Sequence, residues 1–166
     1  MEPFKYTEPN FSPPKVNEKE IRKMSETLLS EKLKKRYHVF GFLQEQEMAD
    51  CLQAADLVVS RAGSSALFEI ALNSKAAILI PLAKAAQGHQ LKNAYFFAKE
   101  AAVEVIEENN LKPHFFLQKI KYLLENEDLL KSMKENISYL ARPKAAWIIA
   151  NYLLEYLGQT NEQQKK

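Results

Sequence analysis

Apolar residues follow two kinds of pattern along the chain. Short, continuously apolar runs rich in β-branched residues predict buried strands, and apolar residues three or four positions apart predict amphipathic helices. The runs predict strands at 37–42, 56–60, 76–81 and 102–107. The helical spacing predicts helices at 17–36, 44–55, 65–74, 89–101, 113–125, 127–141 and 144–157. Because strands alternate with helices, we expect right-handed βαβ units and an α/β fold with a mostly parallel sheet.

The two ends of the chain lack this periodicity. Residues 1–16 hold four of the seven prolines, which predicts an extended arm. Residues 17–157 are expected to form one α/β domain, which starts with Asn17 as an N-cap and Glu20 as its capping-box acid. The polar residues 158–166 predict a frayed tail.

Composition and charge restrict the classes of protein that fit. The chain has 166 residues, of which 46% are hydrophobic and 27% charged, as in soluble globular domains. Its formal net charge of +2 gives no field for binding polyanions, so we expect no nucleic-acid partner. The aromatic residues Phe96, Phe97, Phe115 and Phe116 stand at core-like positions rather than between arginines.

Three features favour the cytoplasm. Cys51 is the only cysteine, so no disulfide can form within the chain, which fits a reducing compartment. The first residues include acids and prolines and do not resemble a signal peptide. No apolar run approaches the roughly 20 residues of a membrane-spanning helix. We therefore expect a cytoplasmic protein that is soluble or lies on the surface of a membrane.

The stretch SRAGSSALFEIA, residues 60–71, carries the first candidate chemistry. It follows the predicted strand 56–60 and opens the next helix. Ligands of open α/β sheets bind at the carboxyl ends of the strands, and small residues at a helix N-terminus let an anion approach the backbone amides. Glu69 follows within two helical turns and is suited to accept hydrogen bonds from a diol such as a ribose. The stretch predicts a phosphate-and-sugar site.

Two further segments reach the same predicted edge. The loop 83–90 after strand 76–81 delivers His89 and Gln90, with Asn93 about one turn further along the helix. The segment 41–43 ends the predicted strand 37–42 and offers a backbone edge for a base. Each signal also has an ordinary explanation: the turn as turn chemistry, Glu69 as a solvated helix acid, and His89 as a helix cap.

Residues 54–94 as a whole resemble a known family. An Ala-Asp-Leu strand, Arg-Ala-Gly, small and hydroxyl residues, an acid, an apolar strand and His-Gln-x-x-Asn-Ala follow one another here. This order resembles the C-terminal, donor-binding domain of the MurG-type transferases of glycosyltransferase family 28. The resemblance implies a Rossmann-like parallel sheet with flanking helices, the C-terminal half of a GT-B fold.

The resemblance also implies a reaction. The family transfers N-acetylglucosamine from its UDP conjugate to an undecaprenyl-pyrophosphoryl-muramoyl pentapeptide, converting lipid I into lipid II in peptidoglycan synthesis. It implies an inverting hexosyltransferase that works at the inner face of the plasma membrane. The UDP-sugar is then a donor substrate, and neither a cofactor nor a metal is implied.

Site roles come with the same resemblance. Glu69 would bind the ribose hydroxyls, and His89 and Gln90 the hydroxyls of the sugar, with Asn93 supporting their helix. The backbone near Phe42 would lie beside the uracil. The diphosphate or the sugar would approach one loop, formed by Gly63, Ser64, Ser65 and Ala66. No residue is assigned as the catalytic base.

The chain departs from the family's pattern in several places. The N-terminal, acceptor-binding domain and the Gly-Gly-Ser loop that opens the C-terminal domain are missing from this sequence. We therefore expect a sheet that is incomplete at its N-terminal edge, with a gap between the predicted strands 37–42 and 56–60. Alanine also replaces the usual residues at four positions, a hydroxyl at Ala66, prolines at Ala76 and Ala83, and a glycine at Ala101. Ala101 is strained only if its φ is positive.

Two readings of the whole chain follow. In the first, it is the donor-binding part of a transferase, inactive alone, whose polyprenyl-linked acceptor is bound by the absent domain or by a partner chain. In the second, it is a non-catalytic α/β module, which oligomerisation or a partner subunit completes. The helix 144–157, with Trp147, Ile148, Leu153 and Leu154, serves either as a docking surface or as an ordinary core-packing helix.

Overall fold

The computed structural model describes residues 17–82 and 88–163, with side chains up to residue 157. The predicted arm 1–16, Ala83 and the last residues of the predicted tail lie outside this part. The chain divides into two compact units, Met1–Glu47 and Met48–Lys166. Each unit is described by itself below.

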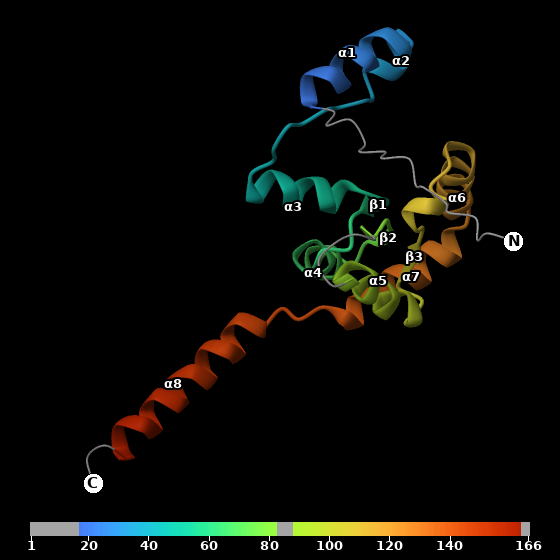
Figure 1. Cartoon of the computed structure of the whole chain (residues 1–166). Coiled ribbons are helices and arrows are strands. Elements are labelled where there is room, and N and C mark those ends of the chain that lie inside the picture. Colours follow the sequence, from blue (N-terminus) through green and yellow to red (C-terminus); the bar gives the residue numbers. More distant parts are fainter. Residues whose placement is uncertain (1–16, 83–87, 164–166) are drawn as a thin grey trace, which may run out of the picture. The chain divides into compact units, whose positions relative to one another are not determined.

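The second unit is built on a three-stranded parallel sheet, seen in Figure 1 with its strands side by side. Its strands are β1 (Leu57–Ser60), β2 (Ala76–Leu79) and β3 (Val103–Val105), in the order β1-β2-β3. Val58 pairs with Ala77, and Ala77 with Val103. The predicted α/β fold with a parallel sheet is confirmed, and β2 is its central strand.

Alternate residues of β2 face two different core clusters. Ala77 and Leu79 pack in one cluster, and Ala76 and Ile78 in the other, all fully buried. A strand that is apolar at every position needs cover on both faces, which explains the continuous run AAIL. The cover comes from helices on both sides of the sheet, as in Rossmann-like folds.

The helices of this unit lie close to their predicted positions. They are α3 (Glu45–Ala54, which begins in the first unit), α4 (Ser64–Leu72), α5 (His89–Lys99), α6 (Pro113–Glu125) and α7 (Glu127–Leu140). A short 3-10 helix, η2 (Glu108–Asn110), follows β3. Helix α7 packs on β2, α4 and α6, and α5 packs on β3. The helices thereby fix the ends of the strands from which the site is built.

The strand predicted at 37–42 does not form. These residues have no regular secondary structure, and the side chains of Phe40 and Phe42 are 59% and 80% exposed. Aromatic and β-branched residues favour a strand only where a neighbouring strand takes up their backbone hydrogen bonds. No ladder to 37–42 forms within the described residues, so the predicted gap between this strand and 56–60 has no counterpart.

The helix predicted at 17–36 forms as two helices. Helix α1 (Glu18–Leu28) begins with the predicted capping box, in which the Asn17 side chain accepts a hydrogen bond from the Glu20 amide at 3.0 Å. The Asn17 amide donates to the Glu20 carboxylate at 3.2 Å. The chain then becomes extended at Leu29, and α2 (Glu31–Lys34) follows. Neither helix has a buried residue.

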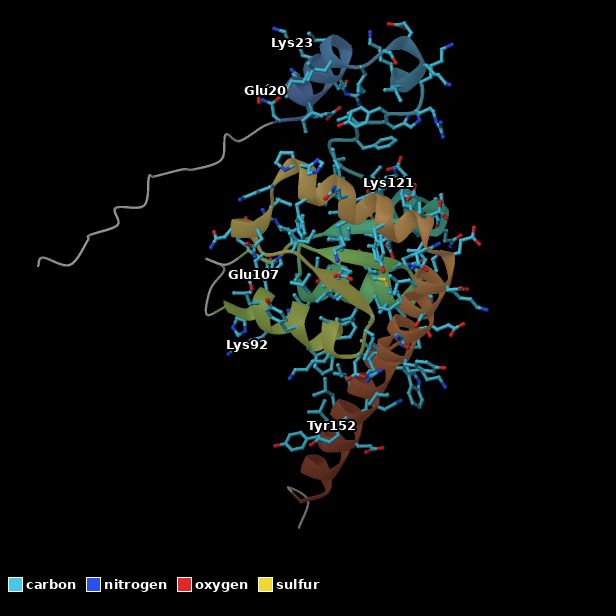
Figure 2. All side chains as sticks on the ribbon, turned by 90° about the vertical axis from the view of Figure 1, so that its right-hand side faces the viewer. Glu20, Lys23, Lys92, Glu107, Lys121 and Tyr152 are labelled. Atoms are coloured by element: carbon cyan, nitrogen blue, oxygen red, sulfur yellow. The ribbon has the colours of Figure 1, made fainter. Side chains whose placement is uncertain are left out.

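Helix α8 (Ala145–Gln163) continues past its predicted end at residue 157. Its side chains are exposed or half-buried throughout the part that is described, with Trp147 at 68% and Leu154 at 66% exposure. Figure 2 shows Tyr152 projecting from it. Among the described residues, no helix has the length and apolar character needed to cross a membrane.

The structure settles the conformation of Ala101. Its φ is 50°, a left-handed conformation in which the Cβ is crowded by the backbone. The resemblance implies a glycine at this position, which would adopt this φ without strain. Ala76, the other described departure outside the candidate site, is simply buried at the start of β2.

Candidate functional site

The turn between β1 and α4 presents backbone amides without steric obstruction. Gly63 is the N-cap of α4, with φ −69°, and no side chain caps the helix. A Cβ added at Gly63 would meet no atom of the described residues within 4 Å. Neither φ nor packing therefore requires a glycine here, whereas close approach of a ligand to the amides of Ser64, Ser65 and Ala66 would. The positive end of the helix dipole favours an anion at this place.

Glu69 lies on the exposed face of α4. It stands four residues after Ser65, so the two side chains share one side of the helix, both exposed. The Glu69 main-chain carbonyl accepts a hydrogen bond from the Asn73 amide group at 2.9 Å. Among the described residues no side chain is paired with its carboxylate, which leaves that group available to a ligand.

The side chains of Gln90 and Asn93 on α5 form hydrogen bonds with neighbouring backbone groups. The Gln90 side-chain oxygen accepts from the Leu82 amide at 2.9 Å, and the Asn93 side chain donates to the Ala62 carbonyl at 3.2 Å. Both bonds attach α5 to the chain just after β2 and β1. The Asn93 bond thus helps to fix the position of α5, and Gln90 keeps its amide nitrogen and one acceptor position on its oxygen for a ligand. The roles of both residues toward a sugar stay predictions. His89 is exposed at the first position of α5.

The start of α5 depends on Gly88. This residue is the N-cap and has φ 67°, in the left-handed region. Only glycine adopts that conformation without strain, and its direction sets where His89 begins the helix. Gly63 and Gly88 thus differ in what a glycine provides. At Gly63 the missing side chain leaves space beside the helix amides, and at Gly88 glycine allows the positive φ.

Arg61 belongs to the first segment predicted at this edge, but no role was predicted for its side chain. Arg61 donates to the Ile80 carbonyl at 3.1 Å and forms an ion pair with Glu108 at 2.8 Å. It therefore bridges the ends of β1 and β2 to the segment after β3. The signal was present in the sequence, since Arg61, Ile80 and Glu108 each follow a strand, and carboxyl ends of parallel strands meet at one edge.

The neighbouring Glu107 was missed as well. It accepts a very short hydrogen bond from the Tyr95 hydroxyl on α5. This hydrogen bond, followed by desolvation and the charge of Glu107, raises the pKa of Tyr95 above 10.0. Tyr95 thus keeps its proton and stays a hydrogen-bond donor. Figure 2 shows Glu107 and Lys92 of α5 at the same side of this unit.

Phe42 is not brought to this edge by any contact described. It belongs to the first unit, where its side chain is 80% exposed. Its predicted approach to a base stays a prediction. The other predicted residues, from Gly63 to Glu69 and from His89 to Asn93, all belong to the second unit, on the two helices that begin at the carboxyl edge.

The geometry suits binding of a phosphate group and a polyol. Main-chain amides at the start of α4 have no helical partner and can bind an anion, and the carboxylate of Glu69 can accept hydrogen bonds from hydroxyl groups. Within residues 17–82 and 88–163, no group of three or more histidine, cysteine, aspartate or glutamate residues could hold a metal ion. The chemistry that the site offers is recognition by hydrogen bonds.

Comparisons with known proteins find relatives of this chain by sequence. The model of the glycosyltransferase family 28 C-terminal domain matches residues 15–148. The UDP-N-acetylglucosamine--N-acetylmuramyl-(pentapeptide) pyrophosphoryl-undecaprenol N-acetylglucosamine transferase of Treponema denticola is 33% identical over 149 residues, which cover 85% of this chain. The transferase of the same name from Desulforamulus reducens is 39% identical over 98 residues, which cover 59% of the chain.

A solved structure is also similar. The crystal structure of Acinetobacter baumannii MurG has a TM-score of 0.64 and 29% sequence identity over 71% of this chain. The match covers 33% of the MurG chain, and the Treponema match covers 38% of that transferase. The present chain thus spans about a third of the length of these relatives. Sequence and fold agree that it belongs to glycosyltransferase family 28, through the C-terminal domain of that family.

Proposed function

We propose that this chain is the UDP-N-acetylglucosamine-binding part of an inverting hexosyltransferase. The complete reaction would add N-acetylglucosamine to an undecaprenyl-pyrophosphoryl-muramoyl pentapeptide in peptidoglycan synthesis. The names of the relatives supply this donor and this acceptor. The observation that carries the proposal is the unobstructed Gly63 turn, with free helix amides at the carboxyl end of β1 and Glu69 on the same helix.

Each part of the donor has a matching group. The diphosphate approaches the amides of residues 63–66, where Ala66 has no hydroxyl to add a further donor. The Glu69 carboxylate accepts hydrogen bonds from the two ribose hydroxyls, and charge-assisted bonds of this kind are the stronger ones. His89 and the amide nitrogen of Gln90 contact the sugar hydroxyls. The backbone near Phe42 serves the uracil in this proposal.

The chemical step needs more than these residues. An acceptor hydroxyl attacks the anomeric carbon, the bond from that carbon to the diphosphate breaks, and UDP leaves with the electron pair. The amides of residues 63–66 stabilise the charge that develops on the leaving diphosphate. In this proposal, the site that binds the acceptor and the base that takes its proton belong to another domain or to a partner chain. Because the acceptor is linked to undecaprenol, we place the reaction at the inner face of the plasma membrane.

A non-catalytic module that works with a partner is the second candidate. One observation favours it: α8 has no buried side chain among its described positions. An apolar helix of this kind offers a surface on which a partner could pack. Binding of the donor is common to both candidates when the module keeps its site. Transfer of the sugar in the presence of an acceptor-binding domain separates them.

Ligand-dependent thermal stability tests the proposed site. Saturating UDP-N-acetylglucosamine should stabilise the chain by about 2.7 kcal/mol at a hundredfold excess over the dissociation constant. Glu69→Ala should lose most of this shift, and Glu135→Ala, which removes an exposed acid from α7, should keep it. Equal responses of the wild type and Glu69→Ala would show that the ribose is bound elsewhere.

A further inference from the structure

Arg61 joins all three strands at their carboxyl ends. It follows β1, donates to the Ile80 carbonyl just after β2, and pairs with Glu108 after β3. A guanidinium is suited to this task because each of its terminal nitrogens carries two N–H donors. Both bonds, at 3.1 and 2.8 Å, come from the same terminal nitrogen, Nη1. The positive charge beside the donor loop is thereby balanced by a carboxylate.

The same backbone is held from the other side by α5. Asn93 contacts the carbonyl of Ala62, the residue after Arg61, and Gln90 contacts the amide of Leu82, two residues after Ile80. Three hydrogen bonds and short stretches of chain form a closed path. It runs from Arg61 to Ile80, along the chain to Leu82, across to Gln90, along α5 to Asn93, and back to Ala62. We call this closed series of contacts the edge ring. It fixes the segment that leads directly into Gly63.

The segment after β3 ties into the ring twice. Glu108 binds Arg61, and Glu107 accepts the hydrogen bond of Tyr95, which stands on α5 one turn or less beyond Asn93. Two adjacent acids thus contact the ring at two places: Glu108 at Arg61, just after β1, and Glu107 at Tyr95 on α5. The segment that carries these acids is separate from the starts of α4 and α5, where the candidate ligand-binding residues lie.

We infer that Arg61 and Glu108 are positioning residues for the donor nucleotide-sugar, which hold the Gly63 loop in its binding geometry without touching the ligand. This inference rests on the proposed function. Both side chains are partly exposed, at 51% and 33%, and ion pairs of this exposure contribute little to the free energy of unfolding. Their effect should therefore be seen in ligand affinity rather than in the melting temperature.

The test compares two ion pairs of the same unit. Arg61→Gln breaks the edge ring, Glu108→Gln breaks the ion pair that attaches the segment after β3 to the ring, and the double variant breaks both. The two single variants are called the ring variants. Lys119→Gln and Glu104→Gln break a similarly exposed pair of 3.2 Å between α6 and β3, which has no link to the ring. Each protein is titrated with UDP-N-acetylglucosamine in a calorimeter, and its melting temperature is measured without ligand.

Both ring variants should weaken binding about tenfold, and the double variant no more than either one, because the two residues act through one contact. The control variants should bind as the wild type does. Arg61→Lys, which keeps the charge and supplies one nitrogen with several N–H donors, should recover part of the affinity. Unchanged affinity in the ring variants would overturn the inference. So would tighter binding by Glu108→Gln, since that outcome makes Arg61 a direct ligand of the diphosphate.

Failure of the proposed function would be seen separately, as absence of binding by the wild type. Amide hydrogen exchange then still tests the ring. Arg61→Gln and Glu108→Gln should speed exchange at residues 62–66 and at Leu82, and Lys119→Gln should not. Equal exchange in all variants would contradict the inference whatever ligand the chain binds.

Discussion

Helices α7 and α8 follow one another in the chain and both carry several large apolar side chains, yet their surroundings differ completely. In α7, Leu130, Met133 and Ile137 are buried between β2, α4 and α6. In α8 every large apolar side chain up to Leu157 is more than half exposed. Helical periodicity therefore predicts that a stripe will be buried, but not what buries it. The difference separates a helix whose apolar side chains are buried within the chain from one whose apolar side chains are exposed.

Shortening one isoleucine in each helix tests whether only α7 is packed within this chain. Ile137→Ala removes a fully buried side chain and should destabilise the chain by about 3 kcal/mol. Ile148→Ala, at 58% exposure, should change stability by less than about 0.5 kcal/mol. Urea unfolding of both variants measures these values. A cost at Ile148 that equals the cost at Ile137 would mean that α8 packs within this chain.

The glycines that precede α4 and α5 should differ in whether their substitution affects stability or ligand affinity. Gly88→Ala forces alanine into φ 67° and should cost about 1–2 kcal/mol. Gly63→Ala meets no neighbour and should cost less than about 1 kcal/mol, while its methyl group lowers affinity for UDP-N-acetylglucosamine. Thermal unfolding and calorimetry of the two variants make the comparison. Unchanged ligand affinity in Gly63→Ala would remove the main argument for an anion at this turn.

Ala101 offers a smaller effect of opposite sign. Replacing it by glycine relieves the strain at φ 50° and should stabilise the chain by about 1 kcal/mol net of the added freedom of the unfolded chain. For a chain of this size the melting temperature should rise by about 2–4 °C. Ala98→Gly, within α5, is the control and should lower the melting temperature. A lower melting temperature in both variants would contradict the positive φ.

The smallest expected effect is the pH dependence that Tyr95 adds. Its pKa is raised above 10.0 by the hydrogen bond to Glu107, so the folded state holds the phenolic proton more tightly than the unfolded state. This stabilisation is present below about pH 10 and is lost as the pH rises through the folded pKa. Tyr95→Phe should weaken the alkaline fall in melting temperature, and Tyr122→Phe should not. Identical alkaline profiles for the wild type and Tyr95→Phe would contradict the contact.

Much of the fold could be predicted because local pattern and tertiary burial agree in the second unit. The helix predicted at 113–125 forms as α6 with those bounds, and AAIL forms the buried central strand. The segment 37–42 shows where such reasoning fails. A strand needs a partner for its backbone, and propensity alone cannot supply one.

For the candidate site, the position of the residues in the fold was predictable, while their binding of a ligand stays a prediction. The rule that ligands meet the carboxyl ends of strands led to residues 63–69 and 89–93, which belong to helices starting at that edge. The role of Gln90 and the contacts of Arg61, Tyr95, Glu107 and Glu108 were not predictable. They join residues far apart in the chain, and their geometry depends on side-chain directions that periodicity does not contain.

The central claim is that the carboxyl edge of this sheet holds a UDP-linked N-acetylated sugar. Calorimetric titration of the purified chain with UDP-N-acetylglucosamine, with UDP-glucose as the control, tests it most directly. We expect saturable binding that prefers the acetylated sugar and is lost in Glu69→Ala. A folded, monodisperse sample that binds neither nucleotide sugar would contradict it.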